Sequence, residues 1–162
     1  MKILGIDPGY DRLGIAIIEN GVLIHSECFE TSRGDDFHIR LKEIGQRVHE
    51  VIKEFSPNIM ALESLFITKN QKTAMKVAEA RGVISYEASL KGIPIHEYSP
   101  PQIKVAVTGH GGSDKSQIIK MIPLLIKIGS KDNLKKAQDD EYDAIAVALT
   151  CQAHIGSKIK TL

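Results

Sequence analysis

The sequence predicts an α/β fold in which a mixed, five-stranded sheet carries helices on both faces. Short apolar runs fill the first thirty residues, and helix-period segments then alternate with further short strands. The chain has 162 residues, 43% of them hydrophobic, and neither a repeat nor a linker divides it, so we expect a single domain over residues 1–162. Cys28 and Cys151 show no metal-ligand spacing, which argues against a disulfide framework and against a zinc site.

Three antiparallel strands are expected at the start of the chain. The apolar run of residues 3–6 is ended by Pro8-Gly9, and two further runs cover residues 13–18 and 22–29. Asn20-Gly21 separates these two runs, and Asn-Gly between apolar runs is the strongest short hairpin signal. The second and third strands should therefore form a hairpin.

Helices alternate with two more strands in the middle of the chain. Apolar side chains at spacings of three to four predict a helix over residues 37–55 that ends at Ser56-Pro57. Residues 59–62 predict a short buried strand that ends at Glu63, and residues 93–98 predict the fifth strand.

Three helical regions complete the pattern. Residues 70–91 have a face of small side chains that can approach another helix closely. After Pro100-Pro101 come one or two helices, which glycines 109, 111 and 112 break. The last helix should run from about residue 139 to residue 155, and it is rich in Ala, Ile and Val.

Two carboxylates stand at predicted strand ends. Asp7 precedes a Pro-Gly turn, so it is either an ordinary turn residue or a functional group at the edge of the sheet. Glu63 ends the strand of residues 59–62, where α/β folds place ligand-binding groups, although a solvated loop acid is the alternative.

Two further acids share one face at the start of the last helix. Asp140 and Asp143 are three residues apart, so their Cβ atoms should lie about 5–6 Å from each other. Acids in a first helical turn commonly cap the backbone and complement the helix dipole. Four acids among residues 139–143 nevertheless repel one another, and a divalent cation would relieve that repulsion.

Together these four acids could form an oxygen-only site for two hard cations. Mg²⁺ and Mn²⁺ prefer carboxylate and water ligands. Two such ions about 4 Å apart can activate water and stabilise the leaving oxygen of a phosphodiester. The pattern therefore indicates metal-dependent phosphodiester hydrolysis without a His or Lys general base.

The charge distribution supports a nucleic-acid substrate. The overall balance of 21 basic against 20 acidic residues would by itself argue against such a partner, because nucleic-acid-binding domains tend to be basic. Residues 104–136, however, carry seven lysines and two aspartates, whereas residues 139–143 carry four acids. With cations bound at the acids, the surface beside them would be positive.

In its motifs the chain resembles the bacterial RuvC Holliday-junction resolvases, a family of RNase H-like nucleases. The resemblance runs from Ile3 to about His154 and rests on several motifs in order: ILGIDPG (3–9), LESLFITKN (62–70), EARGV (79–83), YSPPQIKVAVTGHGGSDKSQ (98–117) and DEYDAIAVALT (140–150). It implies an RNase H-like fold. It also implies a structure-specific endonuclease that resolves Holliday junctions by paired symmetric nicks, in DNA recombination and repair.

The resemblance assigns roles to individual residues. It implies that the catalytic, metal-binding acids are Asp7, Glu63, Asp140 and Asp143, with two Mg²⁺ per subunit and Mn²⁺ as a possible substitute.

The family also implies contacts to DNA and to other proteins. Phe66 would stack on a base near the exchange point of the junction, and Lys104 and Lys115 would contact DNA. The expected partners are four-way junction DNA, a second copy of the chain, and the RuvA–RuvB branch-migration complex. The helix of residues 70–91 is the candidate dimer interface. No apolar stretch is long enough for a membrane span, so a cytoplasmic protein without membrane contact is expected.

Some alternatives stay open at this point. Residues 7–14, DPGYDRLG, also fit the D-x-G-x-x-R-x-G pattern of the related YqgF family, which leaves a nuclease acting on structured RNA as a second function. A junction-binding module without catalysis is a third. The ligand at the start of the last helix is either Asp139 or Asp140, and Arg81 of the EARGV motif has no assigned role.

Overall fold

The computed structural model of the chain describes residues 1–65, 71–128 and 137–159. Within them one mixed sheet has the strand order β5-β4-β1-β2-β3-β6. The first three strands are antiparallel, whereas β4 pairs parallel to β1, β5 parallel to β4, and β6 parallel to β3. The strands are β1 (Lys2–Asp7), β2 (Arg12–Glu19), β3 (Val22–Glu30), β4 (Ile59–Glu63), β5 (Ile95–Tyr98) and β6 (Lys127–Ile128).

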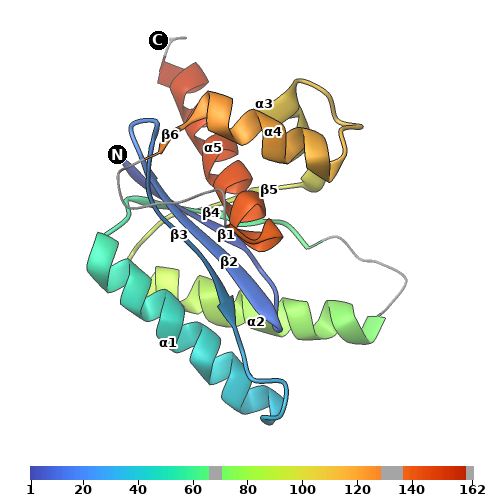
Figure 1. Cartoon of the computed structure of the whole chain (residues 1–162). Helices are drawn as coiled ribbons and strands as arrows, with labels where there is room; N and C mark the ends of the chain where they lie inside the picture. Colours follow the sequence, from blue (N-terminus) through green and yellow to red (C-terminus); the bar gives the residue numbers. More distant parts are fainter. Residues whose placement is uncertain (66–70, 129–136, 160–162) are drawn as a thin grey trace.

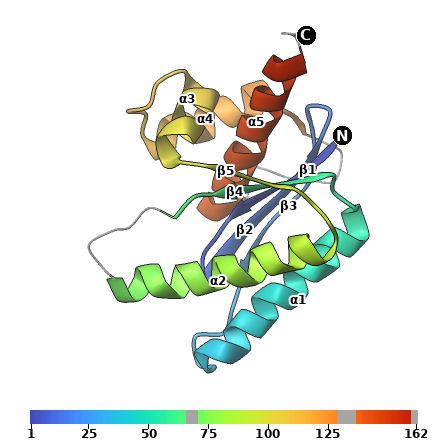
Figure 2. The same cartoon turned by 180° about the vertical axis from the view of Figure 1, so that it is seen from behind.

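Helices cover both faces of this sheet, as the sequence predicts (Figures 1 and 2). On one face lie α1 and α2, and on the other lies α5 with α3 and α4 beside it. No helix of the described segments is both long and apolar enough to cross a lipid bilayer. The helices are α1 (Phe37–Phe55), α2 (Gln71–Leu90), α3 (Pro100–Thr108), α4 (Lys115–Leu125) and α5 (Asp139–Ile159).

The predicted strand count of five is one short, because β6 is a sixth strand. It contains only Lys127 and Ile128, and it pairs with the start of β3 at the edge of the sheet. The Lys127 backbone N–H donates to the carbonyl of Gly21 in the β2–β3 turn, at 2.9 Å. Two residues cannot display a period-two pattern, so only the tertiary position of the hairpin reveals this strand.

Strand alternation decides on which face the strand-end carboxylates lie. In β1, Leu4 and Ile6 are buried in the core beneath α1 and α2, whereas Ile3 belongs to the core beneath α5. Asp7 is four residues after Ile3, so it lies on the α5 face. The same alternation in β4 puts Glu63 on that face as well.

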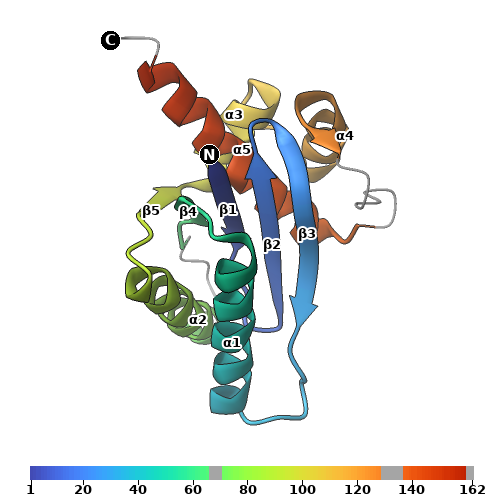
Figure 3. The same ribbon diagram turned by 90° about the vertical axis from the view of Figure 1, so that its left-hand side faces the viewer.

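Two glycines let α5 lie directly on the central strands. A Cβ atom on Gly5 of β1 would lie 2.3 Å from the backbone oxygen of Ala144, and one on Gly14 of β2 would lie 2.1 Å from that of Asp140. Both distances are far below any ordinary contact, so only glycine permits this approach. Figure 3 shows α5 running behind β1 and β2. The first turns of α5 are thereby held beside the ends of these strands.

Candidate active site

Asp7 and Glu63 leave two neighbouring strands side by side. β1 and β4 pair in parallel up to Ile6 and Leu62, so the next residue of each strand is one of these acids. The two carboxyl groups are therefore close enough to influence each other's pKa. Burial raises the pKa of Asp7 well above its usual range, and the negative charges of Glu63 and Asp143 raise it further.

The first turns of α5 bring Asp140 and Asp143 to the same place. The charges of both residues contribute to the raised pKa of Asp7, so all four predicted acids act on one another. Burial also raises the pKa of Asp143 and of Glu63. For Asp143, a hydrogen bond from Lys115 opposes this effect, and for Glu63 the hydrogen bond with Asp7 does.

Basic groups approach the two helical acids from other elements. Lys115 Nζ of α4 lies 2.8 Å from Asp143 Oδ2 and 3.5 Å from Asp139 Oδ2. Although partial burial works to lower the pKa of Lys115, the hydrogen bond and charge of Asp143 raise it overall. Arg12 Nε, at the start of β2, lies 3.3 Å from Asp140 Oδ2.

Asp140 has a further contact, from a cysteine of β3. The Cys28 thiol is 3.7 Å from Asp140 Oδ2 and donates a weak hydrogen bond to it. Burial and the charge of Asp140 raise the pKa of this thiol to about 12. The thiol therefore stays protonated beside the acid at neutral pH.

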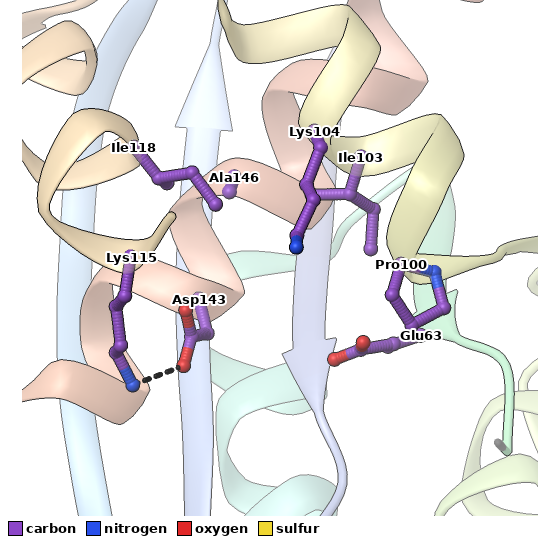
Figure 4. A pocket seen from close by; sticks show the side chains of 8 residues that line it. All are labelled: Glu63, Pro100, Ile103, Lys104, Lys115, Ile118, Asp143 and Ala146. Carbon is purple, nitrogen blue, oxygen red and sulfur yellow. Dashed lines mark hydrogen bonds and ion pairs between the residues drawn. The ribbon is translucent and has the colours of Figure 1, made fainter. Parts of the chain in front are cut away.

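A pocket opens on the α3 and α4 side of these acids (Figure 4). The side chains of Lys104 and Lys115 point into it from two different helices, toward Glu63 and Asp143. The lining residues are Glu63, Pro100, Ile103, Lys104, Lys115, Ile118, Asp143 and Ala146.

The loop before α4 is ordered by its own hydrogen bonds, and these fix the position of Lys115. Asp114 caps α4 by accepting from the Gln117 backbone N–H at 2.9 Å, and the Gln117 side chain accepts from the Asp114 N–H in return. Just before it, the buried Ser113 hydroxyl lies 2.7 Å from the hydroxyl of Thr108 at the end of α3. Lys115 is therefore the first residue of a well-capped helix.

A second pocket lies on the other side of Glu63, against α2. It shares Asp7 and Glu63 with the site, but its remaining walls are neutral. The lining residues are Asp7, Pro8, Glu63, Ser64, Leu65, Thr73, Ala74 and Val77. Glu63 thus lines both the pocket that the two lysines enter and the neutral pocket, whereas Asp7 lines the neutral pocket.

The donor set fits hard divalent cations. All four acids supply carboxylate oxygens, and the negative charges of Glu63, Asp143 and Asp140 raise the pKa of Asp7. Mg²⁺ or Mn²⁺ would offset this repulsion. Within the described segments no three His, Cys, Asp or Glu side chains are grouped closely enough to hold an ion directly. Arg12 and Lys115 offset part of the negative charge, at Asp140 and at Asp143 respectively.

The structure therefore brings together six of the seven residues singled out from the sequence: Asp7, Glu63, Asp140, Asp143, Lys104 and Lys115. The seventh, Phe66, lies outside the described residues. Asp139 is on the outer side, with 64% of its side chain exposed against 17% for Asp140.

Sequence reasoning missed Arg12 and Cys28 as neighbours of Asp140. Arg12 is the arginine of the D-x-G-x-x-R-x-G pattern, which could have indicated its role, whereas no sequence motif includes Cys28. Arg81, which had no assigned role, forms a 2.9 Å ion pair with Glu97, and its charge works to lower the pKa of Glu63.

Comparison with known proteins gives consistent matches in sequence and in structure. The family described as "Crossover junction endodeoxyribonuclease RuvC" matches residues 3–151. A curated relative of that name from Brachyspira hyodysenteriae is 42% identical over 92% of this chain and 92% of its own length. Another from Thermosipho melanesiensis is 41% identical over 91% of this chain and 94% of its own length.

Solved structures agree with these matches. RuvC from T. thermophilus, in complex with a Holliday junction substrate, superimposes with a TM-score of 0.85 at 30% identity and covers 97% of each chain. The yeast mitochondrial Holliday junction resolvase Ydc2 gives a TM-score of 0.69 over 96% of this chain and 80% of its own, but at 14% identity it speaks for the fold alone. The predicted RNase H-like fold class is confirmed.

Proposed function

Because the chain belongs to the RuvC family of crossover junction endodeoxyribonucleases, we propose that it resolves Holliday junctions by nicking two strands symmetrically, in DNA recombination and repair. One observation carries the proposal: β1, β4 and α5 bring four carboxylates together beside a pocket that two lysines enter. Carboxylates that hold cations and lysines that bind phosphate are what phosphodiester hydrolysis needs. The nuclease acting on structured RNA, suggested by residues 7–14, is not favoured, since the family model over residues 3–151 and the relatives that match more than 90% of the chain are RuvC.

We infer that Asp7, Glu63, Asp140 and Asp143 hold two Mg²⁺ ions, for which Mn²⁺ can substitute. When bound, such ions polarise the phosphodiester, supply a hydroxide from water and stabilise the leaving oxygen. Asp140 is a better candidate for the third metal ligand than Asp139, because it is the less exposed of the two and its charge contributes to the raised pKa of Asp7. Because metal ligands must be deprotonated, the raised pKa of Asp7 and of Glu63 links cation binding to the release of protons.

The lysines and the aromatic residue would hold the DNA. Lys104 and Lys115 point into the pocket beside the acids, so both ammonium groups can meet the phosphates that flank the cleaved bond. Phe66 would stack on a base near the exchange point of the junction.

A homodimer would supply the second nick. One domain over residues 1–162 carries one set of acids, and a junction with two cleaved strands needs two sets. On α2, Met75, Tyr86 and Leu90 are exposed large hydrophobic side chains, which supports this helix as the interface. Cooperation with the RuvA–RuvB branch-migration complex follows from the family alone.

The test is divalent-dependent nicking of a synthetic four-way junction. We expect the protein to make two symmetric nicks in the presence of Mg²⁺, and Asp7→Asn to reduce the rate at least about 100-fold because a ligand is lost. Asp35→Asn, in the exposed connection between β3 and α1, is the matched control and should cleave at the rate of the unmodified chain. Cleavage of structured RNA without junction cleavage would overturn the proposal, and so would full activity of Asp7→Asn.

A further inference from the structure

The buried arginine of α1 contacts the turn between β1 and β2. Arg40 is 6% exposed, and its side chain reaches the backbone of that turn. Its Nη2 donates to the Tyr10 carbonyl at 2.9 Å and pairs with the Asp11 carboxylate. Its Nε donates to the Thr31 hydroxyl, also at 2.9 Å.

Thr31 and Tyr10 complete a closed set of contacts around this arginine. The Thr31 hydroxyl, which accepts from Arg40, donates in turn to the Tyr10 carbonyl at 2.7 Å. The Thr31 backbone N–H donates to the Asp11 carbonyl at 3.1 Å. The Tyr10 ring lies with its centroid 5.2 Å from the Arg40 guanidinium carbon and 5.2 Å from Lys76 Nζ of α2. Both helices on that face of the sheet therefore hold the same turn.

This turn joins two groups of the active site. Asp7 precedes the turn and lies beside Glu63 of the neighbouring strand, and Arg12 follows the turn and pairs with Asp140. The turn is tight, because a Cβ atom on Gly9 would lie 2.1 Å from the Arg12 backbone oxygen. A shift of its backbone would consequently move Asp7 and Arg12 together.

We propose that Arg40 is a positioning residue, which fastens the turn of residues 8–11 so that Asp7 stays in register with Glu63. The proposal rests on the proposed function, since it assumes that Asp7 is a ligand of the cleavage site. Arg40 lies on α1, on the side of the sheet away from α5, and its side chain contacts the turn and Thr31 rather than the four acids. Its effect must therefore pass through the backbone of the turn.

Three variants separate positioning from general stability. Arg40→Met keeps the aliphatic stem but removes every hydrogen bond to the turn, and Arg40→Lys keeps one charge without the guanidinium fork. Thr31→Val is nearly isosteric and removes only the hydroxyl. Arg47→Met is the matched control: Arg47 also lies on α1 and pairs with Glu27 of β3 at 2.7 Å, but it does not contact the turn.

Two measurements decide the outcome: single-turnover cleavage with its dependence on junction concentration, and calorimetric binding of Mn²⁺ to the full chain without DNA. For Arg40→Met we expect cleavage about 100-fold slower at saturating junction, with an unchanged junction affinity, because a displacement of about 1 Å at reacting groups costs that much. Mn²⁺ binding should weaken about tenfold. Arg40→Lys and Thr31→Val should lie in between, and Arg47→Met should match the unmodified chain in both measurements.

Several results would overturn the proposal. Unchanged Mn²⁺ affinity and cleavage in Thr31→Val and Arg40→Lys would do so, even if Arg40→Met failed to fold. Equal losses in Arg47→Met would mean that stability alone is responsible. Failure of the proposed function would look different. The unmodified chain would then not cleave junctions, but the Arg40 variants would still bind Mn²⁺ more weakly than the unmodified chain.

Discussion

Asp7 and Glu63 lie next to each other at the ends of two parallel strands. They stand one position beyond the last paired residues of β1 and β4, where the strands open towards the ends of α5 and α2. Burial is the largest cause that raises the pKa of both carboxyl groups, and the negative charge of Asp143 on α5 raises both further. Cation binding and deprotonation are therefore linked at this site, and pH should control both metal affinity and stability.

The first prediction concerns stability against pH. The raised pKa of Asp7, with those of Glu63 and Asp143, means that the folded chain binds more protons than the unfolded chain above the ordinary carboxyl pKa of about 4. Stability without divalent ions should thus fall as pH rises from that value through the raised pKa of Asp7. Thermal unfolding in EDTA between pH 5 and pH 8 measures this fall.

A variant and an added cation test the cause of this loss of stability with rising pH. Asp7→Asn should raise the unfolding temperature at pH 8 in EDTA and flatten the pH dependence, because it removes a charge from the cluster. Millimolar Mg²⁺ at pH 8 should raise the unfolding temperature of the unmodified chain but act much less on the variant. A melting temperature that does not change with pH in EDTA would contradict the linkage.

The second prediction concerns the approach of α5 to the sheet. Gly14→Ala would put a Cβ atom 2.1 Å from the Asp140 backbone oxygen, so the first turn of α5 must shift away from β2. We expect a loss of about 1–3 kcal/mol in the free energy of unfolding, as for other overpacked sites. The rate of junction cleavage should also fall, because Asp140 moves away from Asp7. Denaturant unfolding and junction cleavage measure the two effects.

Gly156→Ala is the control on the same helix. A Cβ atom there would meet nothing within 4 Å, so the change should be neutral or stabilise the helix by up to about 1 kcal/mol. Normal cleavage by Gly14→Ala would show that α5 need not touch β2 at this point.

The third prediction concerns the ion pair between Arg12 and Asp140. Arg12 Nε is 3.3 Å from Asp140 Oδ2, and 49% of its side chain is exposed, so the pair is weak. A divalent cation at Asp140 competes with this guanidinium. Arg12→Gln should therefore tighten Mn²⁺ binding about two- to fivefold, in line with the modest value of exposed ion pairs. Calorimetric titration measures the change, and Arg33→Gln in the exposed β3–α1 connection should leave the affinity as it is. Weaker binding in Arg12→Gln would mean that the arginine supports the site.

The sequence was sufficient for the strand-end acids, because their placement depends on local patterns. The run of residues 59–62 fixes where Glu63 emerges, and Pro8-Gly9 fixes the end of β1 after Asp7. The Asn20-Gly21 hairpin also forms as predicted, with both residues at positive φ. A period of two then puts both acids on one face of the sheet.

Long-range packing explains what the sequence could not supply. In the sequence, nothing distinguishes Gly14 from an ordinary strand glycine. In the structure α5 packs against it, and this contact brings Asp140 near Arg12 and Cys28. The choice between Asp139 and Asp140 likewise depends on how α5 is rotated against the sheet. Rotation about a helix axis follows from packing over the whole helix, and a sequence window does not record it.

The fourth prediction concerns the DNA surface. Lys104 points into the pocket from α3, where its ammonium group can neutralise one phosphate. Lys104→Gln should weaken junction binding uniformly across sequences and lower the slope of log affinity against log salt by about 1. Lys91→Gln, exposed in the connection between α2 and β5, is the matched control and should leave the slope unchanged.

Binding is best measured in Ca²⁺ or EDTA, so that cleavage does not remove the substrate during the titration. Lys104 enters the pocket from α3, whereas Lys115 enters it from α4 and pairs with Asp143. If each lysine meets its own phosphate, the double variant Lys104→Gln with Lys115→Gln should therefore lower the slope by about 2. A double variant with the slope of either single variant would mean that both lysines serve the same phosphate, and an unchanged slope in Lys104→Gln would remove this pocket from the DNA path.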